Sequence, residues 1–262
     1  MLIRHGELLE RVDVALAEEV VDRGGVARGD GFRDHRGCAR FGLRGALARF
    51  GVAERRLALD DPLAGRPYTL RQLLQHRAGV PNYGGLTAYH EAVAAGEQPW
   101  KAEELLRHVN AERLDFETGT GWAYSNVGYF FVRRVLEEAL DDNIGSVLRG
   151  LLFEPLGLAS VRFASTPHDL DATARGNADG YHPDWVYHGL LVGSAGDAAC
   201  FLHRLMTGDV LRLDLLAAMT ERHALDGAPL PGRPWQTAGY GLGLMTGTMD
   251  SVGAAVGHSG NG

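Results

Sequence analysis

The chain has 262 residues, a length that fits one large domain or one domain with an insertion. Hydrophobic residues make up 45% and charged residues 23%, a balance that excludes a disordered tail, a coiled coil and a collagen-like fibre. The formal net charge of −7 predicts no nucleic-acid partner. No apolar run approaches the ~18 residues that a membrane-spanning helix needs, so we expect no membrane span.

The first 56 residues fall into two parts. Residues 1–12 are typical of a hairpin, two short strands with a turn at His5 and Gly6. Residues 13–56 are anomalous, because nine arginines and eight glycines lie between Val21 and Arg56. Glycine at this density costs too much backbone entropy for a helix to be predicted.

Regular patterns resume after the anomalous stretch. Residues 57–62 indicate the end of a helix that leads into a turn. Thr69 is expected to cap a helix over Leu70–Leu74, and apolar positions predict another short helix over Ala102–Val109. The segment Glu117–Gly121 has the composition of a turn.

Two longer helices are expected further along. Ser125 or Asn126 is predicted to cap a helix from Val127 to about Leu140, in which apolar residues recur near every 3.6 positions. Asp197 is predicted to cap a later helix that Gly208 ends.

The C-terminal part returns to strand patterns, with strands predicted at Tyr240–Leu244 and Val252–Val256. Sheet pieces are therefore expected at residues 1–12 and 236–262, with a mainly helical region at residues 57–235. This order predicts a single α+β domain over the whole chain rather than alternating βαβ units.

A phenol and an amide lie two positions apart at the start of the longest predicted helix. Tyr124 and Asn126 can point into one cleft while the helix buries its apolar face. The phenol can relay a proton if nearby cations lower its pKa, and the amide can donate to a substrate carbonyl. Taken alone, the pattern more often indicates simple capping and packing.

A second group follows the last predicted strand, where the sequence is Gly257, His258, Ser259, Gly260. The glycines allow a substrate backbone to lie close to the strand, and His258 adds a polar or cationic group beside it. The alternative interpretation is a tight turn.

These two groups, Tyr124-Ser125-Asn126 and His258-Ser259-Gly260, resemble in this order the second and third motifs of the β-lactamase-related serine hydrolases. That family includes class C β-lactamases, D-Ala-D-Ala carboxypeptidases, D-aminopeptidases and several esterases. The resemblance covers residues 57–262 and, more faintly, residues 1–12. Further segments resemble family landmarks in the same order: Leu59–Leu63 (LDDPL), Thr69–Pro81 (TLRQLLQHRAGVP), Phe116–Gly119 (FETG), Phe153–Leu158 (FEPLGL), Gly189–Leu202 (GLLVGSAGDAACFL) and Tyr240–Gly243 (YGLG).

The resemblance implies an antiparallel β-sheet flanked by helices, with an inserted helical region that carries Tyr124, and a chain that is incomplete at both ends. It also implies acyl transfer on an amide or ester of a small molecule or peptide. Tyr124 and His258 would be the catalytic residues, and Asn126, Ser259 and Gly260 would bind the substrate. Histidine in place of the usual lysine at residue 258 is more similar to the D-aminopeptidase and esterase branches than to true β-lactamases.

The nucleophile and the lysine of the family belong to a Ser-x-x-Lys motif upstream of LDDP, which this sequence does not contain. The first serine is Ser125, and the sole lysine, Lys101, lies downstream. Cys38 is the one candidate for a replacement nucleophile, but Phe41 stands where the lysine belongs. Arg40 cannot act as a base because its guanidinium stays protonated. We therefore expect Cys38 to be either a buried, inert thiol or an unstructured one.

Three alternatives stay open: an acyl-transfer hydrolase, a non-catalytic relative that binds a peptide or acyl ligand, and the product of a frameshifted or truncated gene. The frameshift hypothesis rests on the sharp return of family-like sequence at Leu57, after a stretch typical of GC-rich DNA translated in the wrong frame.

Neither a metal nor a cofactor is expected. Cys38 and Cys200 form no metal-binding pattern. His182, Asp184 and His188 could form a metal site, but the resemblance implies a substrate-lining loop nearby, so no metal is expected there. Residues 1–12 lack the apolar core of a signal peptide, so the chain as it stands reads as cytoplasmic, whereas a truncated N-terminus would allow a periplasmic protein. The sequence leaves the compartment and the oligomeric state open.

Overall fold

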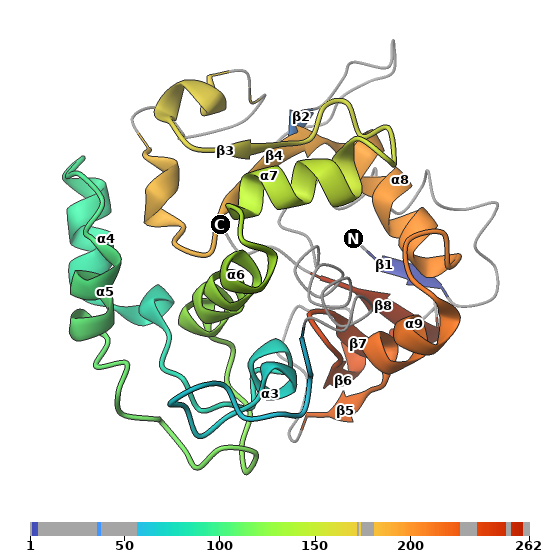
Figure 1. Cartoon of the computed structure of the whole chain (residues 1–262), viewed down its shortest axis with the longest axis horizontal. Helices are drawn as coiled ribbons and strands as arrows, with labels where there is room; N and C mark the ends of the chain where they lie inside the picture. The colour runs from blue at the N-terminus through green and yellow to red at the C-terminus, as the bar shows by residue number, and fades with distance from the viewer. Residues whose placement is uncertain are drawn as a thin grey trace.

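A computed structural model describes residues 2–4, 36–37, 57–171, 173, 181–225, 235–249 and 253–258, the first two ranges by their backbone alone. Figure 1 shows a larger sheet on one side, α4 and α5 on the other, and α6 between them. The helices are α3 Leu70–Leu74, α4 Thr87–Ala94, α5 Ala102–His108, α6 Asn126–Leu140, α7 Ile144–Leu148, α8 Ala195–Met206 and α9 Leu213–Thr220, with short 3-10 or π turns η1 Tyr83–Gly85, η2 Arg149–Phe153, η3 Pro167–Leu170 and η4 Pro183–Trp185. The strands are β1 Leu2–Arg4, β2 Arg36–Gly37, β3 Arg162–Ala164, β4 Leu190–Ser194, β5 His223–Ala224, β6 Trp235–Tyr240, β7 Met245–Met249 and β8 Gly253–Gly257.

The larger sheet joins the two ends of the sequence. Its five antiparallel strands follow the order β1-β8-β7-β6-β5, and β1 pairs with β8 so that Ile3 lies opposite Val256. The chain combines helices with antiparallel sheets, so the predicted α+β class is confirmed. The second strand of the predicted N-terminal hairpin lies outside the described residues.

The strand predicted at Tyr240–Leu244 is wrong, whereas the one predicted at Val252–Val256 is confirmed as β8. Between Tyr240 and Met245 the chain makes a turn, in which Gly243 has a φ of 79°, a left-handed conformation that suits glycine. Apolar residues alternate with glycine in this turn because the turn packs onto α3: the Gly243 N–H donates to the Leu74 carbonyl at 3.1 Å.

A three-stranded sheet in the order β2-β4-β3 lies beside the helical region and was not predicted. β3 and β4 fall within residues 57–235, and Phe163 lies opposite Leu191 in their antiparallel pair. Strands of three and five residues give too few alternating positions to be recognised in the sequence.

The predictions for α3, α5 and α6 are confirmed within a residue or two. At α3, the Thr69 Oγ1 accepts the Gln72 N–H and the Gln72 side chain accepts the Thr69 N–H, a capping box. At α6, Ser125 rather than Asn126 is the N-cap. The turn at Glu117–Gly121 is also confirmed, since the Thr120 N–H donates to the Glu117 carbonyl at 3.0 Å.

The N-cap predicted at Asp197 is wrong. α8 begins at Ala195, and the Ser194 Oγ accepts the Asp197 N–H at 3.1 Å. Asp197 instead lies in the first turn, where its carboxylate accepts the Ser160 hydroxyl at 2.6 Å. Ser194 and Asp197 both have side chains suited to an N-cap and lie three positions apart, and Ser194, which comes first, is the cap.

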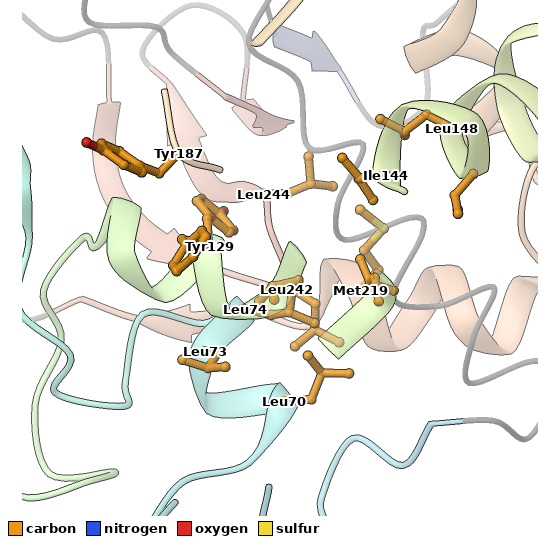
Figure 2. Close-up of a cluster of buried hydrophobic side chains, with 14 of the residues drawn as sticks. Leu70, Leu73, Leu74, Tyr129, Ile144, Leu148, Tyr187, Met219, Leu242 and Leu244 are labelled. Carbon is orange, nitrogen blue, oxygen red and sulfur yellow. The ribbon is translucent and has the colours of Figure 1, made fainter. Parts of the chain in front are cut away.

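The core fixes the helical region against the sheet. Figure 2 shows the leucines of α3 beside Leu242 and Met219. Leu70, Leu74 and Leu242 are fully buried. Because α3 is held in this way, the loop that follows it has a defined position next to the end of β6.

Among the described residues, no helix combines the length and the apolar character that crossing a membrane requires.

Candidate active site

The start of α6 is a tightly bonded turn. The Ser125 Oγ accepts the Gly128 N–H at 2.8 Å and donates to the Pro81 carbonyl at 2.9 Å. Ser125 is 3% exposed. The residues on either side of it, Tyr124 and Asn126, are only half-buried and are therefore the ones that remain accessible to a ligand.

The register of the larger sheet brings His258 to the same place. Tyr240 lies opposite Met245, and Met245 lies opposite Gly257, so the three residues form one row across β6, β7 and β8. His258 follows this row directly, and its Nε2 lies 3.0 Å from the Tyr240 hydroxyl.

The two side chains predicted to be catalytic lie together. The ring centroids of Tyr124 and His258 are 6.0 Å apart, with the ring planes inclined by 60°. Both residues are half-buried. The start of α6 and the end of β8 thus bring a phenol and an imidazole close together.

Asn126 is oriented by a residue that the sequence analysis missed. The Asn82 Oδ1 accepts the backbone N–H of Asn126 at 3.0 Å and the Nδ2 of its side chain at 3.2 Å. The same oxygen accepts the Gly84 N–H, so the orientation of the Asn82 amide is well determined. Among the described residues this is the one bond of the Asn126 side chain, which leaves its Oδ1 and its second Nδ2 proton for a ligand.

His76 was also missed. It follows α3 with a φ of 57°, a left-handed conformation that costs a residue other than glycine roughly 1–2 kcal/mol. Its Nδ1 accepts the Ser125 N–H at 3.1 Å, and its ring centroid lies 4.3 Å from that of Tyr124. A single histidine in a loop has no periodic signal, and the one hint in the sequence is its position within the TLRQLLQHRAGVP segment.

The electrostatics of the site depend on burial. His76 is 2% exposed, and this burial, with a further contribution from the charge of His258, lowers the pKa of His76 well below its ordinary value. His76 is therefore neutral near pH 7 and acts as a hydrogen-bonding group rather than a cation.

Several predicted residues lie outside the described part of the chain, namely Ser259, Gly260 and Cys38. Within the described ranges, no group of three or more His, Cys, Asp or Glu side chains is placed to hold a metal ion. His182 instead caps η4 by accepting the Asp184 N–H, and the Nδ1 of His188 lies 3.2 Å from the Tyr83 hydroxyl.

A family model described as Beta-lactamase matches residues 45–262. The chain belongs to this family. The match contains both segments that meet at the site, the start of α6 and the end of β8.

Two curated relatives carry penicillin-binding and peptidase names. A penicillin-binding protein of Bacillus subtilis (strain 168) is 26% identical over 235 residues, which cover 77% of this chain and 49% of the relative. A D-aminopeptidase of Cereibacter sphaeroides is 29% identical over 222 residues, which cover 80% of this chain and 40% of the relative. The chain therefore spans half or less of the length of these relatives.

Solved structures give the same fold. The D-stereospecific amidohydrolase from Streptomyces sp. superimposes with a TM-score of 0.72 at 22% identity, covering 89% of this chain and 77% of the other. At this level of identity the likeness shows the β-lactamase/transpeptidase-type fold, in agreement with the predicted fold class.

Proposed function

We propose that Tyr124, Asn126 and His258 form the substrate site of an acyl-transfer hydrolase of the D-aminopeptidase or amidase type. The observation that carries the proposal is the 6.0 Å approach of the Tyr124 and His258 rings, which come from distant segments of the chain. Asn126, two residues after Tyr124, adds a side-chain amide that is already oriented by Asn82.

Each side chain has a role in this chemistry. With Tyr124 as the phenolate, a nucleophile adds to the carbonyl carbon of the substrate and gives its proton to Tyr124, and the amine leaves with that proton. Water then adds to the acyl intermediate by the same proton transfer, the acid is released and the nucleophile recovers its proton. The Asn126 Nδ2 donates to the amide carbonyl of the substrate, and His258 donates to a second oxygen of the ligand. Ser259 and Gly260 are proposed to line the ligand beside His258.

The proposed ligands are small amides and peptides with a D-configured residue. The relative named D-aminopeptidase supports this class. Histidine rather than lysine at residue 258 also supports it, because a largely neutral imidazole binds a carboxylate less strongly than an ammonium does. We therefore propose peptidase, amidase or esterase chemistry in preference to lactam hydrolysis.

A second candidate function is binding without turnover, and a specific observation favours it. No serine precedes Ser125, and Lys101 is the only lysine in the chain. Ser125 cannot serve as the nucleophile, because its hydroxyl is buried and bonded to Pro81 and Gly128. A chain of this kind would keep the recognition groups and lose the acylation step.

Binding of D-phenylalanine amide tests the site shared by both candidates. Asn126→Ala is expected to raise the dissociation constant about three- to tenfold, since one hydrogen bond to the ligand is lost. The measurement is isothermal titration calorimetry, with L-phenylalanine amide as the weaker-binding stereochemical control. Asn143→Ala is the matched control, because Asn143 also stands at a helix start but caps α7 away from the site. Equal dissociation constants for the wild type and Asn126→Ala would overturn the proposed site.

Covalent labelling with a fluorescent penicillin or a fluorophosphonate separates the two candidates. A hydrolase forms a covalent adduct with such a probe, and a non-catalytic relative does not. Label that is lost in Cys38→Ala would identify the thiol as the nucleophile. Binding of D-phenylalanine amide without any label would establish the second candidate.

A further inference from the structure

One residue accepts hydrogen bonds from the peptide groups on both sides of Tyr124. The Ala123 N–H donates to the carbonyl oxygen of His76 at 3.1 Å. The Ser125 N–H donates to the Nδ1 of the same histidine, also at 3.1 Å. Ser125 is extended, with φ −135° and ψ 116°, and the N–H groups of alternate residues in an extended segment point to the same side. His76 therefore holds the backbone before and after Tyr124.

His76 is itself firmly placed. It is 2% exposed, and its own N–H donates to the Leu73 carbonyl at 3.1 Å, at the end of α3. Its ring packs against the rings of Tyr129 and Tyr240, with centroids 4.7 and 4.8 Å away. Its left-handed φ costs free energy in a residue other than glycine, and such a conformation persists where the surrounding contacts fix it. A residue held in this way can keep a neighbouring segment in one position.

The hydrogen bond from Ser125 requires an unprotonated Nδ1 on His76. A backbone N–H can only donate, so the ring nitrogen that faces it must accept. Burial lowers the pKa of His76 and keeps the ring neutral near pH 7, so its one proton is on Nε2. The side chain thus offers a fixed lone pair to the residue that follows Tyr124.

We propose that His76 is a positioning residue that orients Tyr124 toward His258 by holding the peptide groups on either side of Tyr124. With the backbone fixed, the phenol can vary only in its own rotamer. The His76 ring, whose centroid lies 4.3 Å from that of Tyr124, restricts this rotamer. The use of the oriented phenol in proton transfer rests on the proposed function. The orientation does not, because these contacts are all made within the protein.

The first experiment is a long-range proton–nitrogen NMR spectrum of protein labelled with 15N histidine, recorded at pH 8 without ligand. The wild type is expected to show His76 with a proton on Nε2 and none on Nδ1, and His76→Asn identifies its signals. A His76 Nδ1 that carries a proton would overturn the inference, because it could not accept the Ser125 N–H.

The second experiment separates the acceptor from the size and the backbone strain of the residue. His76→Asn keeps an acceptor oxygen where the histidine has Nδ1, and asparagine tolerates a left-handed backbone. His76→Leu and His76→Gly both lack the acceptor; leucine has the same branch at Cγ, and glycine has no strain at this φ. The readout is the nuclear Overhauser cross-peak between the rings of Tyr124 and His258, whose centroids lie 6.0 Å apart. We expect the cross-peak to be retained in His76→Asn and lost in His76→Leu and His76→Gly.

The chain offers a matched control. The Nδ1 of His182 accepts the Asp184 N–H at 3.2 Å, so His182→Leu removes the same kind of hydrogen bond from η4 and should leave the cross-peak in place. Loss of the cross-peak in His76→Asn or His182→Leu would overturn the inference. So would its retention in folded His76→Leu or His76→Gly. Failure of D-phenylalanine amide to bind would count against the proposed function and leave this inference in place, because both experiments are done without ligand.

Discussion

Gly79→Ala is expected to destabilise the protein by roughly 2–5 kcal/mol. Gly79 lies three residues after His76 and has a φ of 76°, in the left-handed region. A Cβ atom at this position would overlap the carbonyl oxygen of Phe116, which belongs to the backbone and cannot turn away. The Asp115 N–H also donates to the Gly79 carbonyl at 2.8 Å, so the two segments are held close together. The decrease in the free energy of unfolding is measured by urea-induced unfolding of the wild type and Gly79→Ala.

Gly65→Ala is the matched control for this prediction. Gly65 has a similar φ of 69°, but nothing lies within 4 Å of the Cβ that alanine would add. Only the conformational cost remains, which is about 1–2 kcal/mol. Equal losses in free energy of unfolding for the two variants would show that the segments of Gly79 and Phe116 are not packed as described.

Acidification from pH 7 to pH 5 is expected to reduce the stability of the wild type through His76. The pKa of this histidine is lowered in the folded state by burial and by the charge of His258. Below the unfolded pKa of about 6.5, the unfolded chain takes up a proton that the folded protein does not. The stabilisation that comes from keeping His76 neutral is therefore fully present above about pH 6.5, and it is lost as the pH falls below that value. The loss through this group is about 1.4 kcal/mol per pH unit while folded His76 stays neutral.

His76→Gln removes the titrating group, so its free energy of unfolding should fall less steeply with pH than that of the wild type. The titratable side chains that face His76 are buried Tyr129 and Tyr240 and half-buried Tyr124. The charge of half-buried His258 also acts on His76. His90→Gln, which alters an exposed ring, is the control and should show the wild-type slope. Identical slopes for the wild type and His76→Gln would contradict the burial of a neutral His76.

The helices could be predicted from the sequence because their signals are local. Thr69 and Ser125 satisfy backbone N–H groups two or three residues away, and the apolar face of α6 recurs within one segment. The error at Tyr240–Leu244 has a local cause as well. Alternation of glycine and leucine looks like a strand, but here it belongs to a turn whose leucines are buried against α3.

The hydrogen bonds that join the elements of the site could not be predicted, because several of them connect residues that are far apart in the sequence. His76 meets Tyr240 across 164 residues, and Asn82 meets Asn126 across 44. Local patterns gave Tyr124, Asn126 and His258 both a functional and a structural interpretation, and the resemblance to a known family favoured the functional one. The order of the larger sheet likewise depends on the pairing of β1 with β8 from opposite ends of the chain.

The central claim is that Tyr124 and His258 form one ligand site. Nuclear Overhauser spectra of the tyrosine and histidine rings test this claim most directly. They are recorded with and without D-phenylalanine amide. We expect a cross-peak between the Tyr124 and His258 rings in the free protein, as their 6.0 Å centroid separation requires, and changes in both sets of signals when the amide binds. Absence of the cross-peak, or an amide that binds and leaves both rings unperturbed, would contradict the account.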